Sequence, residues 1–294
     1  MNRARNKARP GKVSMAHVVS LGSRLTERDR QIVLDCYEHH VLTTGQIERL
    51  HFTGARTARE RLYVLYELRV LDRFRPPWRR GEGSTPYHWI LDEAGAHVVA
   101  ELHGLDRREL KWRHSTALAL SHSAKLRHLL EINEFFARLS QEAVQAGGAL
   151  TEWYGERSSQ QLFDGEINPD GYGVVAHPSH DPIHVVLELD RATEPTSTLR
   201  DKAIRYAKAL PRSVLSESRP VIILAVPTPA RASAATAVTV NASAPISVAV
   251  WDRAGSPLAI VLAASRPSVR LDDARKALLR ESSTVRDPRR AGVR

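Results

Sequence analysis

Cysteine and long apolar runs are both scarce in this chain of 294 residues. The single cysteine, Cys36, excludes an internal disulfide and favours a reducing, cytoplasmic location. Because Cys36 shares helical spacing with Ile32 and Val33, we interpret it as a core residue rather than a nucleophile. The longest stretch of low charge, residues 221–249, is interrupted by prolines and an arginine, so it cannot cross a bilayer as one helix. We therefore expect a protein without membrane contact.

Three kinds of site lack a sequence signature. No glycine-rich phosphate loop of the Walker type occurs, which argues against an NTP-driven motor. His180 and His184 flank a proline-containing turn, and no third ligand has the spacing of a zinc site. His114, His122 and His128 fall in one helical segment beside basic residues, and we interpret them as part of a solvated face. No Ser/His/Asp set can be singled out.

Acidic residues are too few to balance the basic ones. Against 43 lysines and arginines stand 33 aspartates and glutamates, which gives a formal net charge of +10. This imbalance favours a polyanionic partner, and double-stranded DNA is the leading candidate. Residues 1–24 begin with a basic run that contains no acid, and residues 253–294 end in an arginine-rich tail. We expect both ends to be largely disordered.

Residues 25–105 have the pattern of a winged helix-turn-helix domain. Threonines stand where helices should begin, and Thr26 is followed by acids in the first turn. In such a domain the third helix lies in the major groove, and the wing touches the DNA backbone or minor groove. The expected elements are helices beginning near residues 26, 44 and 57, strands over 70–75 and 87–91, and a last helix to about residue 102.

The basic side chains of this domain fall on the two elements that would meet DNA. These are one stripe of the third helix and the hairpin between the two strands. We expect the helix residues to enter the groove and the hairpin residues to contact phosphates. The alternative is a solvated helix face on a module used for protein contacts. The predicted DNA-binding residues are Arg56, Arg59, Tyr63, Arg73, Arg75, Arg79 and Arg80.

Residues 147–252 predict a second domain with a mixed α/β sheet. A connector and long helix, residues 106–146, should join it to the first domain, and the helix expected over 114–146 ends at a pair of glycines. The elements expected after it are strands over 150–156, 162–175 and 183–190, a helix over 198–210, a strand over 220–226, a short helix over 229–237 and a strand over 246–251.

Two carboxylates stand at the end of the strand predicted over 183–190. Side chains alternate along a strand, so Glu188 and Asp190 should point to the same face. Asp170 follows the preceding extended segment, and the Gly/His/Pro-rich stretch between could close a hairpin that brings all three acids together. Such a set of oxygen ligands predicts a site for Mg²⁺ or Mn²⁺. The alternative is that Pro169-Asp170 simply forms a turn and that Asp190 caps the next helix.

This order of elements is similar to the core of restriction-endonuclease-like proteins, whose signature is Pro-Asp, a spacer and then Asp/Glu-x-Lys. Pro169-Asp170 and Glu188 match the signature, whereas Asp190 stands where the lysine belongs. Some members carry that lysine on the following helix, where Lys202 is the candidate by position. The resemblance implies a metal-dependent DNA endonuclease or nickase. Its catalytic residues would be Asp170, Glu188, Asp190 and Lys202, with the three acids as metal ligands.

Both halves together resemble the replication-relaxation family of actinobacterial plasmids and integrative elements. The resemblance implies DNA binding linked to plasmid or mobile-element replication, relaxation or mobilisation, with a relaxase, a replication initiator or a second copy of the chain as further partners. Two alternatives stay open: a non-enzymatic accessory factor with a degenerate nuclease-like scaffold, and a transcriptional regulator with a ligand-sensing second domain. The residues that carry the resemblance are 42–52, 59–62, 91–96, 169–171 and 188–194, with Lys202 and Tyr206.

Overall fold

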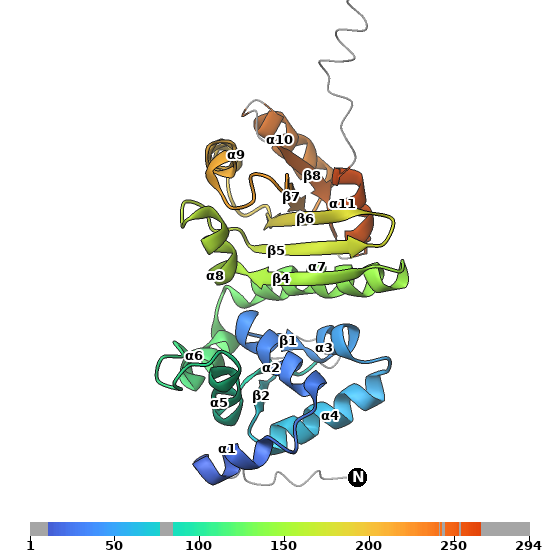
Figure 1. Cartoon of the computed structure of the whole chain (residues 1–294). Coiled ribbons are helices and arrows are strands. Elements are labelled where there is room, and N and C mark those ends of the chain that lie inside the picture. Colours follow the sequence, from blue (N-terminus) through green and yellow to red (C-terminus); the bar gives the residue numbers. More distant parts are fainter. Residues whose placement is uncertain (1–10, 77–84, 241, 243–244, 253, 266–294) are drawn as a thin grey trace, which may run out of the picture.

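The computed structural model describes residues 11–76, 85–240, 242, 245–252 and 254–265. Within these residues, a three-stranded sheet lies among the N-terminal helices and a five-stranded sheet lies in the C-terminal half. Helix α7 (Leu126–Gln145) runs between the two groups and contacts both (Figure 1). The expected mixture of helices and sheets, with a mixed sheet in the second half, is confirmed.

Two capping boxes determine where the second and third helices begin. The Thr26 hydroxyl accepts a hydrogen bond from the backbone N–H of Asp29, whose carboxylate accepts one from the backbone of Thr26. Thr43 and Gln46 repeat this arrangement. The N-terminal elements are α1 (Met15–Leu21), α2 (Glu27–Glu38), β1 (Leu42–Thr43), α3 (Thr44–His51), α4 (Ala55–Glu67), β2 (Leu71–Phe74), β3 (His88–Leu91) and α5 (Glu93–Leu102).

Two features of this part differ from the sequence prediction. Residues 15–21, expected within a disordered arm, form α1, which Ser14 caps and whose Leu21 is buried in the core. Leu42 and Thr43 add a third strand, which pairs antiparallel with β3. Elements this short have little stability of their own. Tertiary contacts hold them in place, so the local sequence pattern does not reveal them.

The five-stranded sheet has the order β4-β5-β6-β7-β8. Its first three strands are antiparallel neighbours, and the predicted β5–β6 hairpin is confirmed. The last three are parallel, and the crossover connections that such pairing needs are supplied by α9 and α10. The elements are β4 (Ala149–Gly155), β5 (Gly171–His177), β6 (His180–Leu189), α9 (Thr196–Ala209, then a 3-10 turn at Leu210–Arg212), β7 (Val221–Val226), α10 (Pro229–Val240) and β8 (Ile246–Val250).

Helices cover both faces of this sheet. Leu187 of β6 shares a buried cluster with Phe136 of α7 and Val261 of α11 (Pro257–Ser265). Its neighbour Val186 points to the opposite face and packs in a cluster with Tyr206 of α9. Helices α7 and α11 therefore cover one face, and α9 and α10 cover the other (Figure 1). Both faces of β6 are buried, as expected for a central strand.

Three segments of this half differ from the prediction. The helix expected over 114–146 is interrupted at Ser123, whose backbone is extended, so α6 (His114–Ala119) and a 3-10 turn (Leu120–His122) precede α7. The strand expected over 162–175 begins only at Gly171, because α8 (Glu156–Ser159) and a 3-10 turn (Gln160–Phe163) come first. Helix α11 lies within the expected disordered tail. Residues 1–10 and 266–294 lie outside the described residues.

Buried polar contacts join the N-terminal helices to α7. The side-chain amide of Asn133, on α7, donates to the backbone carbonyls of His39 (3.2 Å) and Val41 (2.7 Å). The next residue of α7, Glu134, forms an ion pair with Arg49 of α3 (3.0 Å). Asn133, His39 and Val41 are all buried, so these hydrogen bonds are made away from water. The contacts fix the position of the N-terminal helices against the five-stranded sheet.

Candidate functional site

Asp170 and Glu188 face each other where β5 begins and β6 ends. Gly171 pairs with Leu187 in the antiparallel register, so the two acids occupy the next opposed positions. The backbone N–H of Leu189 donates to Oδ2 of Asp170 at 2.7 Å, which holds that carboxylate against the end of β6. The hairpin thus brings together two of the acids that the sequence analysis selected.

The packing beneath Asp170 requires a glycine at position 171. A Cβ atom at this position would lie 2.6 Å from a ring carbon of Phe136. Phe136 is fully buried in α7 and has no room to move away. The absence of a side chain at Gly171 therefore lets the start of β5 lie directly on α7, and it places Asp170 within reach of α7 side chains.

Two side chains of α9 hold the Glu188 carboxylate. The Lys202 ammonium lies 2.6 Å from Oε2, and the Tyr206 hydroxyl donates to Oε1 at 2.5 Å. Lys202 and Tyr206 are four residues apart, so one face of α9 presents both to the same carboxylate. The lysine that is missing from the strand is thus next to the strand acid, although it comes from the following helix.

Negative charge is crowded at this point. Burial, together with the nearby Asp170 carboxylate, raises the pKa of Glu188 to about 7, although Lys202 and Tyr206 act in the opposite direction. Burial disfavours the charged form of Lys202, but the carboxylates of Glu188 and Asp170 outweigh this effect and raise the pKa of the lysine. Lys202 supplies one positive charge beside these two carboxylates, and a proton or a second cation would balance the other negative charge.

His128 of α7 is also part of the site. Its Nε2 lies 3.0 Å from Oδ1 of Asp170, and this hydrogen bond raises the pKa of the imidazole despite partial burial. From the sequence alone His128 is interpreted as part of a solvated face, because helical spacing shows which residues share a face but not what the face meets. The close contact of β5 with α7 at Gly171 brings this histidine to Asp170.

Asp170, Lys202 and His128 line an open pocket of about 330 Å³. It lies between the beginning of α7, the end of β6 and α9. Glu188 does not line it, because only 1% of this residue is exposed and Lys202 stands in front of it. The cationic side chains of the pocket suit a phosphate group, and the acids suit a metal ion. Its charged or titratable lining residues are Lys125, His128, Arg191 and Lys202 with Asp170, Asp190 and Glu194.

Asp190 does not join the other two acids. Its Oδ2 accepts a hydrogen bond from Nε of Arg231 in α10 at 2.5 Å, and its Oδ1 accepts one from the backbone N–H of Ala192 at 2.9 Å. Arg231 also donates to the carbonyl of Glu194 at 2.7 Å. The expected convergence of three carboxylates is therefore wrong: in the part of the chain that the structure describes, no three His, Cys, Asp or Glu side chains group to hold a metal. Asp190 holds the loop after β6.

The residues predicted to meet DNA on the third helix, α4, are exposed. Arg56 and Arg59 lie on its outer surface, where Arg56 forms an ion pair with Glu60 at 2.8 Å. Tyr63 is 47% exposed on the same helix. These side chains are accessible to a partner. Two of the predicted hairpin residues, Arg79 and Arg80, lie outside the described residues.

Arg73, by contrast, is held by aromatic rings. Its guanidinium carbon lies 4.0 Å from the ring centre of Tyr87, and that of Arg75 lies 3.8 Å from the same ring. Arg75 is exposed, whereas Arg73 is partly buried. Arg73 therefore has a structural role in the packing of α4 against the hairpin. The other rings near Arg73 belong to Tyr66 (4.5 Å), Trp89 (5.5 Å) and Tyr63 (5.8 Å).

Comparison with known proteins identifies a family but no single relative. None of the helices in the described ranges has the length and apolar character needed to span a membrane. No curated protein and no solved structure matches the chain. The family model described as replication-relaxation matches residues 35–217, a range that contains Asp170, Glu188 and Lys202. Because this match covers more than half of the sequence, the chain belongs to the replication-relaxation family.

Proposed function

We propose that this protein binds DNA during the replication or relaxation of a plasmid or mobile element, and that its C-terminal half contains a metal-dependent DNA nicking site. Membership of the replication-relaxation family supports the first part. One observation carries the second: Asp170, Glu188 and Lys202 come together from three separate elements beside a pocket with further basic groups.

The order of the elements supports a division into two domains. In residues 25–105, α2, α3 and α4 are followed by the β2–β3 hairpin and α5, as in a winged helix-turn-helix. In residues 147–252, a mixed sheet with helices on both faces has its acids where two neighbouring strands end and begin, as in a restriction-endonuclease-like core. Residues 106–146 connect the two. The exposed side chains of α4 are the proposed DNA contacts, and Arg75 is the described hairpin residue best placed to join them.

The donors at the site fit a divalent cation that prefers oxygen ligands. Asp170 and Glu188 supply two carboxylates, and the pKa of Glu188 is raised first by burial and then by the negative charge of Asp170, which a cation would offset. These two residues, with the carbonyl of Leu189, would hold Mg²⁺ or Mn²⁺. The ion would supply Lewis-acid activation of a water molecule and of the phosphate.

The remaining side chains have roles that need no direct contact with the ion. Lys202 orients Glu188 and offers a positive charge to the scissile phosphate. His128 orients Asp170 through their hydrogen bond. Asp190 maintains the loop that forms one wall of the pocket, through Arg231 and Ala192. Its contacts favour this role over that of a metal ligand.

The direct test is the conversion of supercoiled plasmid to nicked circles in Mg²⁺ or Mn²⁺. We expect the wild type to nick, and we expect Asp170→Ala and Glu188→Ala to lower the rate by at least roughly 100-fold, because each removes a carboxylate that the ion needs. Asp181→Ala, at the exposed far end of the same hairpin, is the matched control and should nick at the wild-type rate. Equal rates for all four proteins would refute the nicking proposal.

A second function, that of a non-enzymatic accessory factor, is favoured by one observation. Both oxygens of Glu188 are already bonded, to Lys202 and Tyr206, and the residue does not line the pocket. Such a factor would bind DNA in a salt-sensitive manner, and Asp170→Ala would leave the affinity unchanged. Calorimetry separates the two functions, because Mg²⁺ binding that is lost in Glu188→Ala counts against the accessory factor.

A further inference from the structure

A second pocket, of about 360 Å³, adjoins the nicking site proposed above. It lies at the carboxyl ends of the parallel strands β6, β7 and β8, which is where open α/β sheets commonly bind ligands. The two pockets share Leu189, the last residue of β6, and Asp190 and Arg191, the first two residues of the loop after it. The second pocket has no part in the proposed chemistry.

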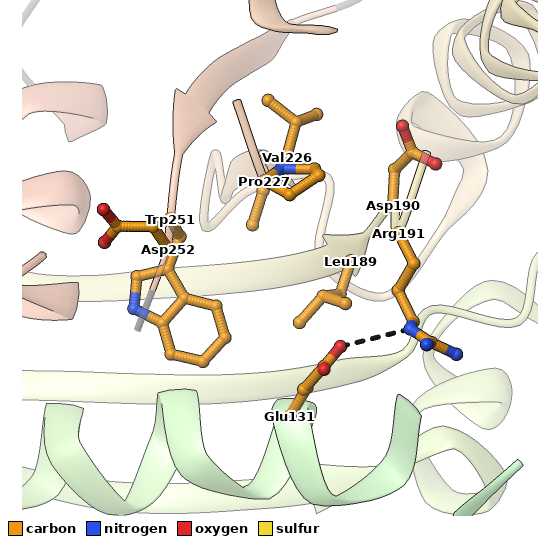
Figure 2. A pocket seen from close by; sticks show the side chains of 9 residues that line it. Glu131, Leu189, Asp190, Arg191, Val226, Pro227, Trp251 and Asp252 are labelled. Atoms are coloured by element: carbon orange, nitrogen blue, oxygen red, sulfur yellow. Dashed lines mark ion pairs between the residues drawn. The ribbon is translucent and has the colours of Figure 1, made fainter. Parts of the chain in front are cut away.

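Five of the nine residues that line this pocket are apolar, and the other four are Glu131, Asp190, Arg191 and Asp252. The six-membered ring of Trp251 lies on the pocket side, across from Arg191 with Leu189 between them (Figure 2). The carboxylates of Asp190 and Asp252 point away from its middle in the same view (Figure 2). The apolar lining residues are Leu189, Ala225, Val226, Pro227 and Trp251.

One ion pair forms the polar edge of the pocket. Nε of Arg191 lies 3.4 Å from a carboxylate oxygen of Glu131, which extends upward from α7 (Figure 2). This contact holds the planar guanidinium at the boundary between the two pockets. An arginine in that position can stack on a flat ring or contact the backbone next to it.

The two pockets suit different parts of one nucleotide. A phosphate would lose its hydration against Leu189, Ala225 and Trp251 without gaining enough positive charge, whereas a flat uncharged ring would bury apolar surface there. The first pocket instead offers Lys125 and Lys202. The shared wall is three residues long, which spans only about 7 Å in an extended chain, so one nucleotide can reach both pockets.

We propose that the second pocket receives an unpaired base next to the phosphate bound in the first pocket. This inference rests on the proposed function, since it takes the first pocket to be the phosphate site. A base that is stacked and paired in a duplex cannot enter such a pocket, so the preferred substrate is single-stranded or locally unpaired DNA. Trp251 and Leu189 would contact the base, and Arg191 would contact the deoxyribose that joins the base to the phosphate.

The test compares two fluorescent single-stranded 15-mers in fluorescence anisotropy, with Ca²⁺ in place of Mg²⁺. One carries thymine at every position, and the other has the same backbone with abasic sites throughout. Ala225→Leu fills the pocket from β7, and Ala225→Val does so with less strain if the larger variant does not fold. Ala230→Leu, which adds the same bulk at an exposed position of α10, is the matched control.

We expect the wild type and Ala230→Leu to bind the thymine strand roughly tenfold more tightly than the abasic strand, since stacking contributes to each bound base. In the pocket-filled variants this ratio should fall toward one, while affinity for the abasic strand stays unchanged. A ratio near one in the wild type, or a ratio that folded Ala225 variants leave intact, would overturn the proposal and point to another occupant such as a protein side chain. The plasmid assay reports independently on nicking, because a base pocket can bind DNA whether or not Asp170 supports cleavage.

Discussion

The Glu188 side chain is enclosed by a lysine, a tyrosine and a second carboxylate, and its protonation follows from that position. A carboxyl group exposed to water would be ionised at neutral pH, but burial and Asp170 raise the pKa of Glu188 to about 7. The residue therefore holds its proton in the folded protein at pH values where it has lost that proton in the unfolded chain.

We expect this difference to make stability depend on pH. With a pKa raised from 4.5 to about 7, Glu188 makes its full contribution to the free energy of unfolding below about pH 4.5, and the contribution is lost as the pH rises through 7. Glu188→Gln cannot titrate. The wild-type free energy of unfolding minus that of this variant should therefore fall by roughly 1–3 kcal/mol between pH 4.5 and 8. Urea unfolding at a series of pH values measures it, and a difference independent of pH would contradict the prediction.

The contacts of Asp190 with Arg231 and Ala192 indicate that it stabilises the loop after β6, and this role can be tested. Asp190→Ala leaves the largely buried guanidinium of Arg231 without its carboxylate and should lower the free energy of unfolding by about 3 kcal/mol. Arg231→Leu in the same chain should recover part of the loss, because no unpaired charge then remains buried. Calorimetry should also show Mg²⁺ affinity close to wild type in folded Asp190→Ala. A complete loss of Mg²⁺ binding would instead identify Asp190 as a ligand.

At the scale of elements, Arg73 joins a helix to a hairpin. Its guanidinium lies over Tyr66 of α4 and over Tyr87 and Trp89 next to or within β3. The Trp89 indole N–H also donates to the Thr44 hydroxyl at 2.9 Å, which connects the same cluster to α3. The cluster therefore sets the angle at which α4, the proposed DNA-reading helix, leaves the small sheet.

Two arginines predicted to bind DNA should consequently behave differently when replaced. Arg73→Ala should lower the free energy of unfolding by about 1–2 kcal/mol, because it removes several cation–π contacts. Arg59→Ala, at an exposed position of α4, should leave stability within about 0.5 kcal/mol and weaken DNA binding several-fold at low salt. Thermal unfolding and anisotropy with a DNA duplex measure both effects. Equal loss of stability in the two variants would contradict the structural role of Arg73.

Elements with strong local signals were predictable from the sequence, and those that depend on distant contacts were not. Thr26 and Thr43 have capping partners three residues away, so both helix starts could be found. The position of Lys202 on the helix after β6 likewise identifies it as the candidate for the lysine that the strand lacks, although its pairing with Glu188 is seen only in the structure. Nothing near His128 or Asp190 in the sequence shows that their partners are Asp170 and Arg231, which lie about 40 residues away. The sequence does not show the interruption at Ser123, because apolar residues continue at helical spacing across it.

At the scale of the whole molecule, α7 contacts both the five-stranded sheet and the N-terminal helices. Phe136 packs under the five-stranded sheet, while Asn133 and Glu134 contact the N-terminal helices. The His39 ring adds a stacked contact with Trp153 of β4, with ring centres 3.4 Å apart. DNA held by α4 and a strand bound at the Asp170 pocket would therefore be held by one rigid unit rather than by two freely moving domains.

This shared helix leads to a prediction for cooperativity. Wild-type protein should unfold in urea in one transition, seen alike by far-ultraviolet circular dichroism and by tryptophan fluorescence. Asn133→Ala removes the side-chain donor from both carbonyls, although that of His39 keeps the backbone N–H of Val41, and should lower the free energy of unfolding by roughly 1–3 kcal/mol. Because the lost contacts lie between the two cores, the two signals should then separate, with the N-terminal helices unfolding first. Gln145→Ala, at the exposed end of α7, should change neither, and coincident transitions in Asn133→Ala would show that the two parts are coupled by other contacts.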